Sequence, residues 1–136
     1  MSNIEINNQT KKKINKKYIK LILKKILSIV KKKINISVAL VNEKQIKRLN
    51  KEYRQTNKVT NVLSFSGLEL KGEKIPQGEI IICWPVLKKE AKIYGHPIKE
   101  ELKISLVHSV LHLLGFKHGK KMRKKEKELL KKLKNV

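Results

Sequence analysis

The predicted fold is organised around residues 97–118, whose sequence is PIKEELKISLVHSVLHLLGFKH. Pro97 suits the first turn of a helix and Gly115 suits its exit, so we expect one helix between them. This helix is apolar on almost every side, which indicates that it is buried in the centre of the domain. Its aliphatic residues are Leu102, Ile104, Leu106, Val107, Val110, Leu111, Leu113 and Leu114.

Three histidines occur in and directly after this apolar helix. His108 and His112 are four residues apart, so both side chains project from one face, about one turn apart. Gly115 can adopt the left-handed conformation without a steric penalty, and the reversed chain then brings His118 back toward them. Histidines without partners are costly to bury among aliphatic side chains, and a shared metal ion removes that cost. We therefore predict that His108, His112 and His118 bind one ion.

The predicted ligand set also indicates the type of site. Three neutral imidazole nitrogens suit zinc and leave a fourth position open for water, which is typical of a catalytic site. Nickel and other divalent ions also accept imidazole ligands, so the sequence does not determine the metal. The pattern predicts a small metal-dependent hydrolase.

The remaining elements follow from hydrophobic periodicity and capping residues. Alternating patterns predict strands at 3–7 and 34–40, and short apolar runs predict two more strands at 62–65 and 79–83, which are candidate partners in a hairpin. Helical patterns predict four further helices: one capped by Thr10 and reaching Val30, one opened by an Asn42–Gln45 capping box, one over 85–95 and one over 119–134. Residues 67–78 are expected to form a turn-rich connection. Together these elements predict a single α+β domain over residues 1–136, a small mixed β-sheet packed with helices around the central buried helix.

The composition limits the class of protein. A chain of 136 residues fits one domain that buries about two-thirds of its unfolded surface. No apolar run approaches the roughly 20 residues needed to cross a bilayer. Cys83 is the only cysteine, so no internal disulfide can form, and it is expected to be a small buried residue. These features favour a cytoplasmic protein.

The charge has two explanations that the sequence leaves open. Lys and Arg number 34 against 11 acidic residues, which gives a net charge of +23. Such a field attracts polyanions such as nucleic acid. However, a chain this rich in Lys, Ile and Asn can also reflect AT-rich coding. All acidic residues are Glu, which excludes a Ser-His-Asp triad and a magnesium or calcium cage built from Asp.

The spacing His-x-x-x-His-x-x-Gly-x-x-His also occurs in zinc endopeptidases of the metzincin type. In those enzymes a glutamate follows the first histidine and acts as the base. Ser109 occupies that position here and cannot replace a carboxylate. The sequence therefore disfavours a peptidase.

Five short motifs follow one another along the chain: LNKEYR at 49–54, TNVLSF at 60–65, GEIII at 78–82, YGH at 94–96 and HSVLHLLGFKH at 108–118. In this order they resemble the bacterial YbeY family of rRNA-maturation endoribonucleases, over roughly residues 34–118. The resemblance implies a metal-dependent single-strand endoribonuclease that acts in 16S rRNA maturation and ribosome quality control. Its partners would be precursor rRNA and the ribosome or ribosomal proteins. It also implies that His108, His112 and His118 hold zinc and that Arg54 is the essential arginine of the active cleft.

The chain departs from the family pattern at two positions. Family members usually have Gly at the position of Ser109 and an acid at the position of Lys117. In the family an acidic segment tends to follow the third histidine, whereas in this chain the basic segment Gly119-Lys120-Lys121 follows His118. The charge around the mouth of the cleft therefore differs from that of the family.

Several roles stay open at this level. Thr60, Asn61 and Ser64 can bind ribose or phosphate, or can serve only the turn and the strand start. His96 is interpreted as structural, and no general base is evident. The alternative function is a non-catalytic ribosome-assembly factor in which the metal is purely structural.

Overall fold

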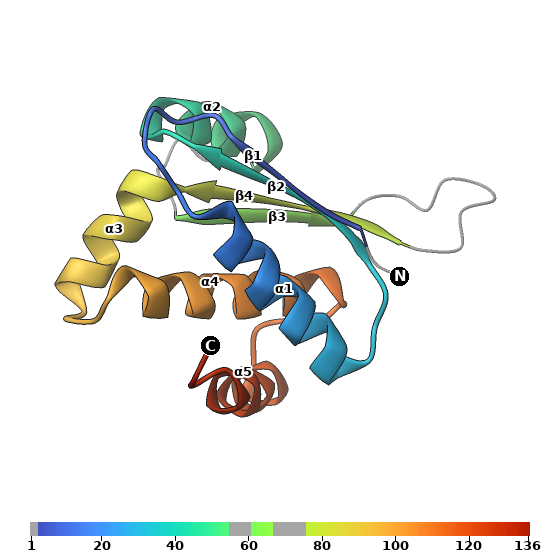
Figure 1. Cartoon of the computed structure of the whole chain (residues 1–136). Helices are drawn as coiled ribbons and strands as arrows, with labels where there is room; N and C mark the ends of the chain where they lie inside the picture. The colour runs from blue at the N-terminus through green and yellow to red at the C-terminus, as the bar shows by residue number, and fades with distance from the viewer. Residues whose placement is uncertain (1–2, 55–60, 67–75) are drawn as a thin grey trace.

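The computed structural model describes residues 3–54, 61–66 and 76–136, and its elements form the predicted α+β fold (Figure 1). In chain order they are β1 (Ile4–Asn8), α1 (Lys16–Val30), β2 (Asn35–Val41), α2 (Glu43–Arg54), β3 (Val62–Ser66), β4 (Gln77–Cys83), α3 (Trp84–Ile93), α4 (Ile98–Leu113) and α5 (Lys120–Lys132).

The strands form one mixed sheet in the order β1-β2-β4-β3. Strands β1, β2 and β4 are parallel, whereas β3 runs antiparallel to β4. Leu63 of β3 lies opposite Ile81 of β4, which confirms that the strands predicted at 62–65 and 79–83 are partners. Among the strands of the described residues, β3 is consequently at one edge of the sheet.

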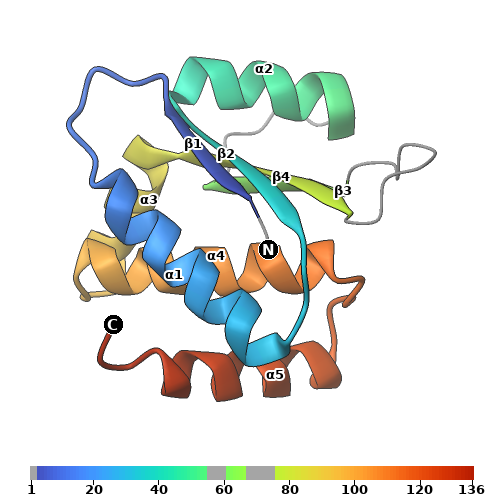
Figure 2. The same ribbon diagram turned by 45° about the vertical axis from the view of Figure 1, so that its right-hand side comes forward.

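Helices cover both faces of the sheet. Helix α2 lies on one face and helices α1 and α4 lie on the other, with α5 packed beneath α4 (Figures 1 and 2). Strand β4 illustrates the two layers, because Ile80 and Ile82 belong to the large core on the α1–α4 side and Ile81 and Cys83 belong to a smaller core on the α2 side. Burial on both faces explains why this strand is a continuous apolar run rather than an alternating one.

Helix α4 is the central buried helix, as predicted. Leu106, Val107, Val110 and Leu111 are completely buried in it. Each such side chain contributes about 1.5–3 kcal/mol through burial. Helix α4 is therefore a rigid support for the histidines that it carries.

The start of β4 differs from the prediction. Gln77 and Gly78, which were assigned to the connection, pair with Asn35 and Ile36 of β2 inside the strand. The glycine has a packing role rather than a turn role, because a Cβ atom on Gly78 would lie only 2.8 Å from Cδ1 of Leu113 on α4. Glycine at this position lets the C-terminal end of α4 approach the sheet closely.

The predicted start of the first helix was wrong. Helix α1 begins at Lys16, and its cap is Asn15, whose side chain accepts a hydrogen bond from the Tyr18 N–H. Thr10 instead donates its hydroxyl to Asn8 Oδ1 at 2.6 Å. Asn and Thr are both good caps, and the choice between them depended on where β1 ended.

The predicted capping box at α2 is confirmed. The Gln45 N–H donates to Asn42 Oδ1 at 2.9 Å, and the Asn42 N–H donates to Gln45 Oε1 at 3.1 Å. This reciprocal pair satisfies two amide groups that the first turn of a helix leaves free. It sets the position of α2, which ends at Arg54.

Candidate metal centre

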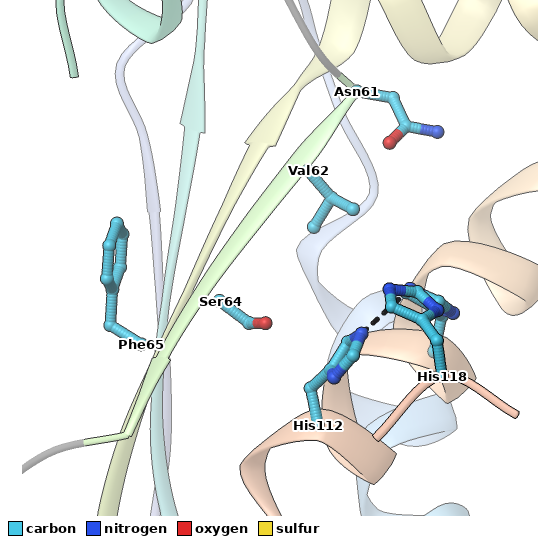
Figure 3. A pocket seen from close by; sticks show the side chains of 7 residues that line it. Asn61, Val62, Ser64, Phe65, His112 and His118 are labelled. Atoms are coloured by element: carbon cyan, nitrogen blue, oxygen red, sulfur yellow. Dashed lines mark hydrogen bonds between the residues drawn. The ribbon is translucent and has the colours of Figure 1, made fainter. Parts of the chain in front are cut away.

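Helix α4 presents two of the predicted ligands from its last two turns. His108 and His112 project from one face of the helix, and His118 returns to them from the segment after it. Figure 3 shows the side chains of His112 and His118 close together. One potential ligand atom from each ring lies within 4.8 Å of the others. The structure thus brings together the three residues that the sequence singled out.

The return of His118 depends on the end of α4. Gly115 has a φ of +96°, in the left-handed region that the sequence predicted for it. The Gly115 N–H donates to the His112 carbonyl and the Phe116 N–H donates to the Leu111 carbonyl, both at 3.0 Å. These two bonds form a Schellman motif, which ends the helix and reverses the chain.

The same turn sets the tautomer of His112. Nδ1 of His112 lies 3.1 Å from the Phe116 carbonyl oxygen. A carbonyl can only accept, so Nδ1 carries the proton and donates it. In the neutral ring Nε2 is then left with its lone pair, the form in which histidine binds a metal.

His108 has an equivalent partner. Its Nδ1 lies 3.1 Å from Oε1 of Glu126 on α5, so Nδ1–H donates to the carboxylate. The Nε2 atoms of His108 and His112 lie 3.1 Å apart, and in the two neutral rings with Nδ1–H both Nε2 atoms carry lone pairs. Two lone pairs at this distance repel each other unless a cation lies between them.

Burial lowers the pKa of His112 below its ordinary value, and the charge of His108 adds to this shift. The neutral ring of His112, the form that binds a metal, is therefore favoured. The donor set, three imidazoles with two Nε2 lone pairs already converging, fits a divalent metal ion.

The histidines line a cleft of about 590 Å³, and edge strand β3 forms its opposite wall. Figure 3 shows Asn61, Val62 and Ser64 pointing toward the histidines, while Phe65 points to the other side of the strand. His108 and His112 are half-buried and His118 is exposed. A metal ion held here would therefore be reachable from solvent, as a substrate requires.

Asn61 connects this wall to the rest of the fold. Its Nδ2 donates to Oε2 of Glu90 on α3 at 2.9 Å, and its carbonyl accepts from the Cys83 N–H at 2.8 Å. Burial and the nearby charge of Glu101 raise the pKa of Glu90 above its ordinary value, and the Asn61 bond partly offsets this. Asn61 therefore links β3 to α3 and β4, in addition to lining the cleft.

Comparison with known proteins places the chain in a family. A family model described as Endoribonuclease YbeY matches residues 4–134. The chain belongs to the endoribonuclease YbeY family. It is 39% identical over 99 residues to Endoribonuclease YbeY of Campylobacter jejuni, a match that covers 71% of this chain and 73% of the relative. It is 40% identical over 97 residues to that of Staphylococcus carnosus, with 67% and 63% covered.

A solved structure has the same fold. The solution structure of TM1509 from Thermotoga maritima superposes with a TM-score of 0.67 at 29% sequence identity, covering 96% of this chain and 88% of that one. As a YbeY-family member, the chain is an RNA-cleaving hydrolase, and its histidine cluster is consistent with metal dependence. No helix among the described residues is both long and apolar enough to cross a membrane.

Three residues that the sequence analysis named lie away from the histidine cluster or have side chains outside the described residues. Arg54 is the last residue of α2, but its side chain lies outside the described part of the structure, as does Thr60. Ser109 is buried inside α4 and does not line the cleft. This placement removes it from consideration as the base of a peptidase.

Two partners of the ligands were not found from the sequence: the Phe116 carbonyl and Glu126. A backbone carbonyl leaves no signal in a sequence. Glu126 did leave one, because it shares the inward face of α5 with Met122 and Leu129. A carboxylate at such a position requires a partner.

Proposed function

We propose that this chain is a single-strand-specific, zinc-dependent endoribonuclease that acts in 16S rRNA maturation and ribosome quality control. It would work in the cytoplasm, in contact with the ribosome or ribosomal proteins. The observation that carries the proposal is the set of three imidazoles, with ligand atoms within 4.8 Å of one another, at an open cleft of a YbeY-family chain.

Each ligand has a part in holding the metal. His108 and His112 offer Nε2 atoms whose direction is set by Glu126 and Phe116, and His118 completes the set from the exposed side. When bound, zinc supplies Lewis acidity, which neutralises charge on a phosphoryl oxygen and lowers the pKa of water toward about 7. The three neutral nitrogens leave a position for water or substrate.

The size of the cleft supports a single-stranded substrate. A volume of about 590 Å³ is that of a small-ligand site, which suits unpaired nucleotides better than a duplex. Ser64 and Asn61, on the wall opposite the metal ligands, offer polar groups to ribose or phosphate. The net charge of +23 adds affinity for the RNA backbone, because lysine–phosphate contacts release counterions.

Arg54 is proposed as the catalytic arginine. Its guanidinium carries a planar fork of donors that matches a phosphate and can stabilise the charge developing on it. Functional side chains tend to lie where a rigid element meets a loop, and Arg54 is the final residue of α2.

The test compares two arginines of one helix. Arg48 lies on α2 and is exposed, so Arg48→Ala is a matched control for Arg54→Ala. We expect Arg54→Ala to bind a single-stranded RNA like the parent and to cleave it about 10²–10³-fold more slowly, by analogy with the removal of an oxyanion donor. Arg48→Ala should bind and cleave like the parent. The measurements are RNA binding and cleavage, each with zinc, with a chelator and after zinc is restored.

The cellular role is tested by rescue. Cells depleted of the protein should accumulate 16S rRNA precursors, and the parent and Arg48→Ala should correct this while Arg54→Ala and His112→Ala should not. If no protein cleaves RNA with any metal, yet His112→Ala still fails in cells, the chain is an assembly factor with a structural metal. Equal cleavage by parent and Arg54→Ala would exclude a catalytic arginine at position 54.

A further inference from the structure

Helix α5 carries a charged residue in its apolar stripe. Met122, Leu129 and Leu133 are at most 1% exposed, and they pack into the large core. Glu126 follows Met122 by four residues and precedes Leu129 by three, so it lies on the same inward face. Its side chain is only 23% exposed. A carboxylate at this position is unfavourable unless a specific partner compensates for its lost hydration.

The partner of Glu126 is a histidine, although the helix offers many lysines. Eight of the 13 residues of α5 are Lys or Arg, yet the ion pair found for Glu126 in the described residues is with His108 of α4. Glu128, two residues further on, is more exposed and pairs with Lys125 of its own helix. Of these two glutamates, Glu126 is therefore the one that faces α4.

The contact is made to a particular ring nitrogen. Oε1 of Glu126 lies 3.1 Å from Nδ1 of His108, while Nε2 of the same ring lies 3.1 Å from Nε2 of His112. Nδ1 and Nε2 point to opposite sides of an imidazole. The oxygen that bonds Nδ1 is therefore on the far side of the ring from the metal ligands, and Glu126 acts on the site through His108.

We propose that Glu126 is a positioning residue of the metal centre, which holds His108 in its Nδ1–H tautomer and aims Nε2 at the ion. Helix α5 then belongs to the site although it contributes no ligand, because its docking onto α4 places the carboxylate. The inference rests on the proposed metal site. Carboxylate partners of metal-binding histidines typically change metal affinity 10–100-fold when removed.

The experiment compares Glu126→Ala and Glu126→Gln with Glu128→Ala, which removes an equal charge from the outer face of the same helix. The first measurement is the Zn²⁺ dissociation constant of each protein, by competition with a chelator. The second is the tautomer of His108 in metal-free protein at pH 8, by ¹⁵N NMR of the ring nitrogens. Circular dichroism and thermal unfolding of the metal-free proteins show whether each variant is folded.

We expect Glu126→Ala to weaken zinc binding 10–100-fold and to lose the Nδ1–H tautomer of His108 as the dominant form. Glu126→Gln should keep that tautomer, because its amide oxygen still accepts the proton, and should recover part of the affinity. Glu128→Ala should match the parent. The proposal is overturned if Glu126→Ala keeps parental affinity, if the tautomer is unchanged, or if Glu128→Ala has the same effect.

Two failures are distinguishable. If the parent itself binds no metal, the proposed zinc enzyme is wrong, but the tautomer measurement still decides whether Glu126 sets the His108 ring. If Glu126→Ala does not fold, Glu126→Gln carries the test, since it keeps the shape and the acceptor of the parent. A Glu126→Gln protein that is folded but has lost the Nδ1–H tautomer would contradict the proposal.

Discussion

A histidine–glutamate pair lies at each end of α4, and the two pairs are built differently. At the N-terminal end, Nε2 of His96 contacts the carboxylate of Glu101, which is 4% exposed. Toward the C-terminal end, His108 meets Glu126 through Nδ1 instead. In the first pair the carboxylate contacts Nε2, whereas in the second it contacts Nδ1 and Nε2 lies toward His112.

We infer that the role of each histidine depends on which of its ring nitrogens contacts the carboxylate. His96 compensates a buried carboxylate, and among the described residues the only cluster of three potential metal ligands is the one at His108, His112 and His118. In the proposed metal site, Glu126 orients His108 and leaves its Nε2 to bind the ion. Residue types alone do not separate the two cases.

The largest expected effect separates the two pairs by metal content. We expect the parent to hold about one divalent ion per chain, His112→Ala to hold almost none, and His96→Ala to hold as much as the parent. His118→Ala should lose metal less completely, because both helical ligands remain. Metal analysis after dialysis measures this, and zinc at 100 times its Kd should stabilise the parent and His96→Ala by about 2.7 kcal/mol. Metal loss in His96→Ala would remove the distinction between the pairs.

The second effect is on stability at the N-terminal pair. Glu101→Ala should reduce the free energy of unfolding of the metal-free protein by about 1–3 kcal/mol, since it removes a buried hydrogen-bonded partner from His96. Glu52→Ala, an exposed glutamate on α2, should change it by less than about 0.5 kcal/mol. Urea unfolding measures both. Equal effects from the two variants would show that the His96–Glu101 contact adds nothing to stability.

The smallest effect concerns Glu90, which lies near the same pair. Burial and the charge of Glu101 raise the pKa of Glu90, so the native state binds its proton more tightly than the unfolded state does. Ionised Glu90 therefore lowers stability at neutral pH, and this cost disappears as pH falls below the unfolded pKa of about 4.3. Glu90→Gln should raise the unfolding free energy at pH 7–8, by less than Glu101→Ala lowers it, and the gain should vanish near pH 4. Urea unfolding of both proteins across this pH range is the measurement. A gain that is present near pH 4 and absent at pH 7–8 would contradict the raised pKa of Glu90.

Much of the fold was predictable from local signals. The central helix, its Gly115 exit and the Asn42–Gln45 capping box each depend on a few neighbouring residues, and all three are confirmed. The cap of α1 was not predictable in this way. Asn15 and Thr10 have similar intrinsic capping preferences, and Thr10 was already engaged by Asn8 at the end of β1.

In the candidate site, too, some features follow from local sequence and others from contacts between elements. The spacing of His108, His112 and His118 follows from helix geometry and one glycine, so these residues and their convergence could be derived from the sequence, and the motifs around them pointed to the YbeY family. The tautomers of His108 and His112, which leave the Nε2 lone pairs for a metal ion, could not be derived from the sequence. They depend on the docking of α5, which brings Glu126 to His108 across a separation of 18 residues, and on the Phe116 carbonyl, which the turn directs at His112. Local spacing sets which side chains share a face, but the direction of a lone pair depends on contacts between elements, and only packing of the whole chain determines those contacts.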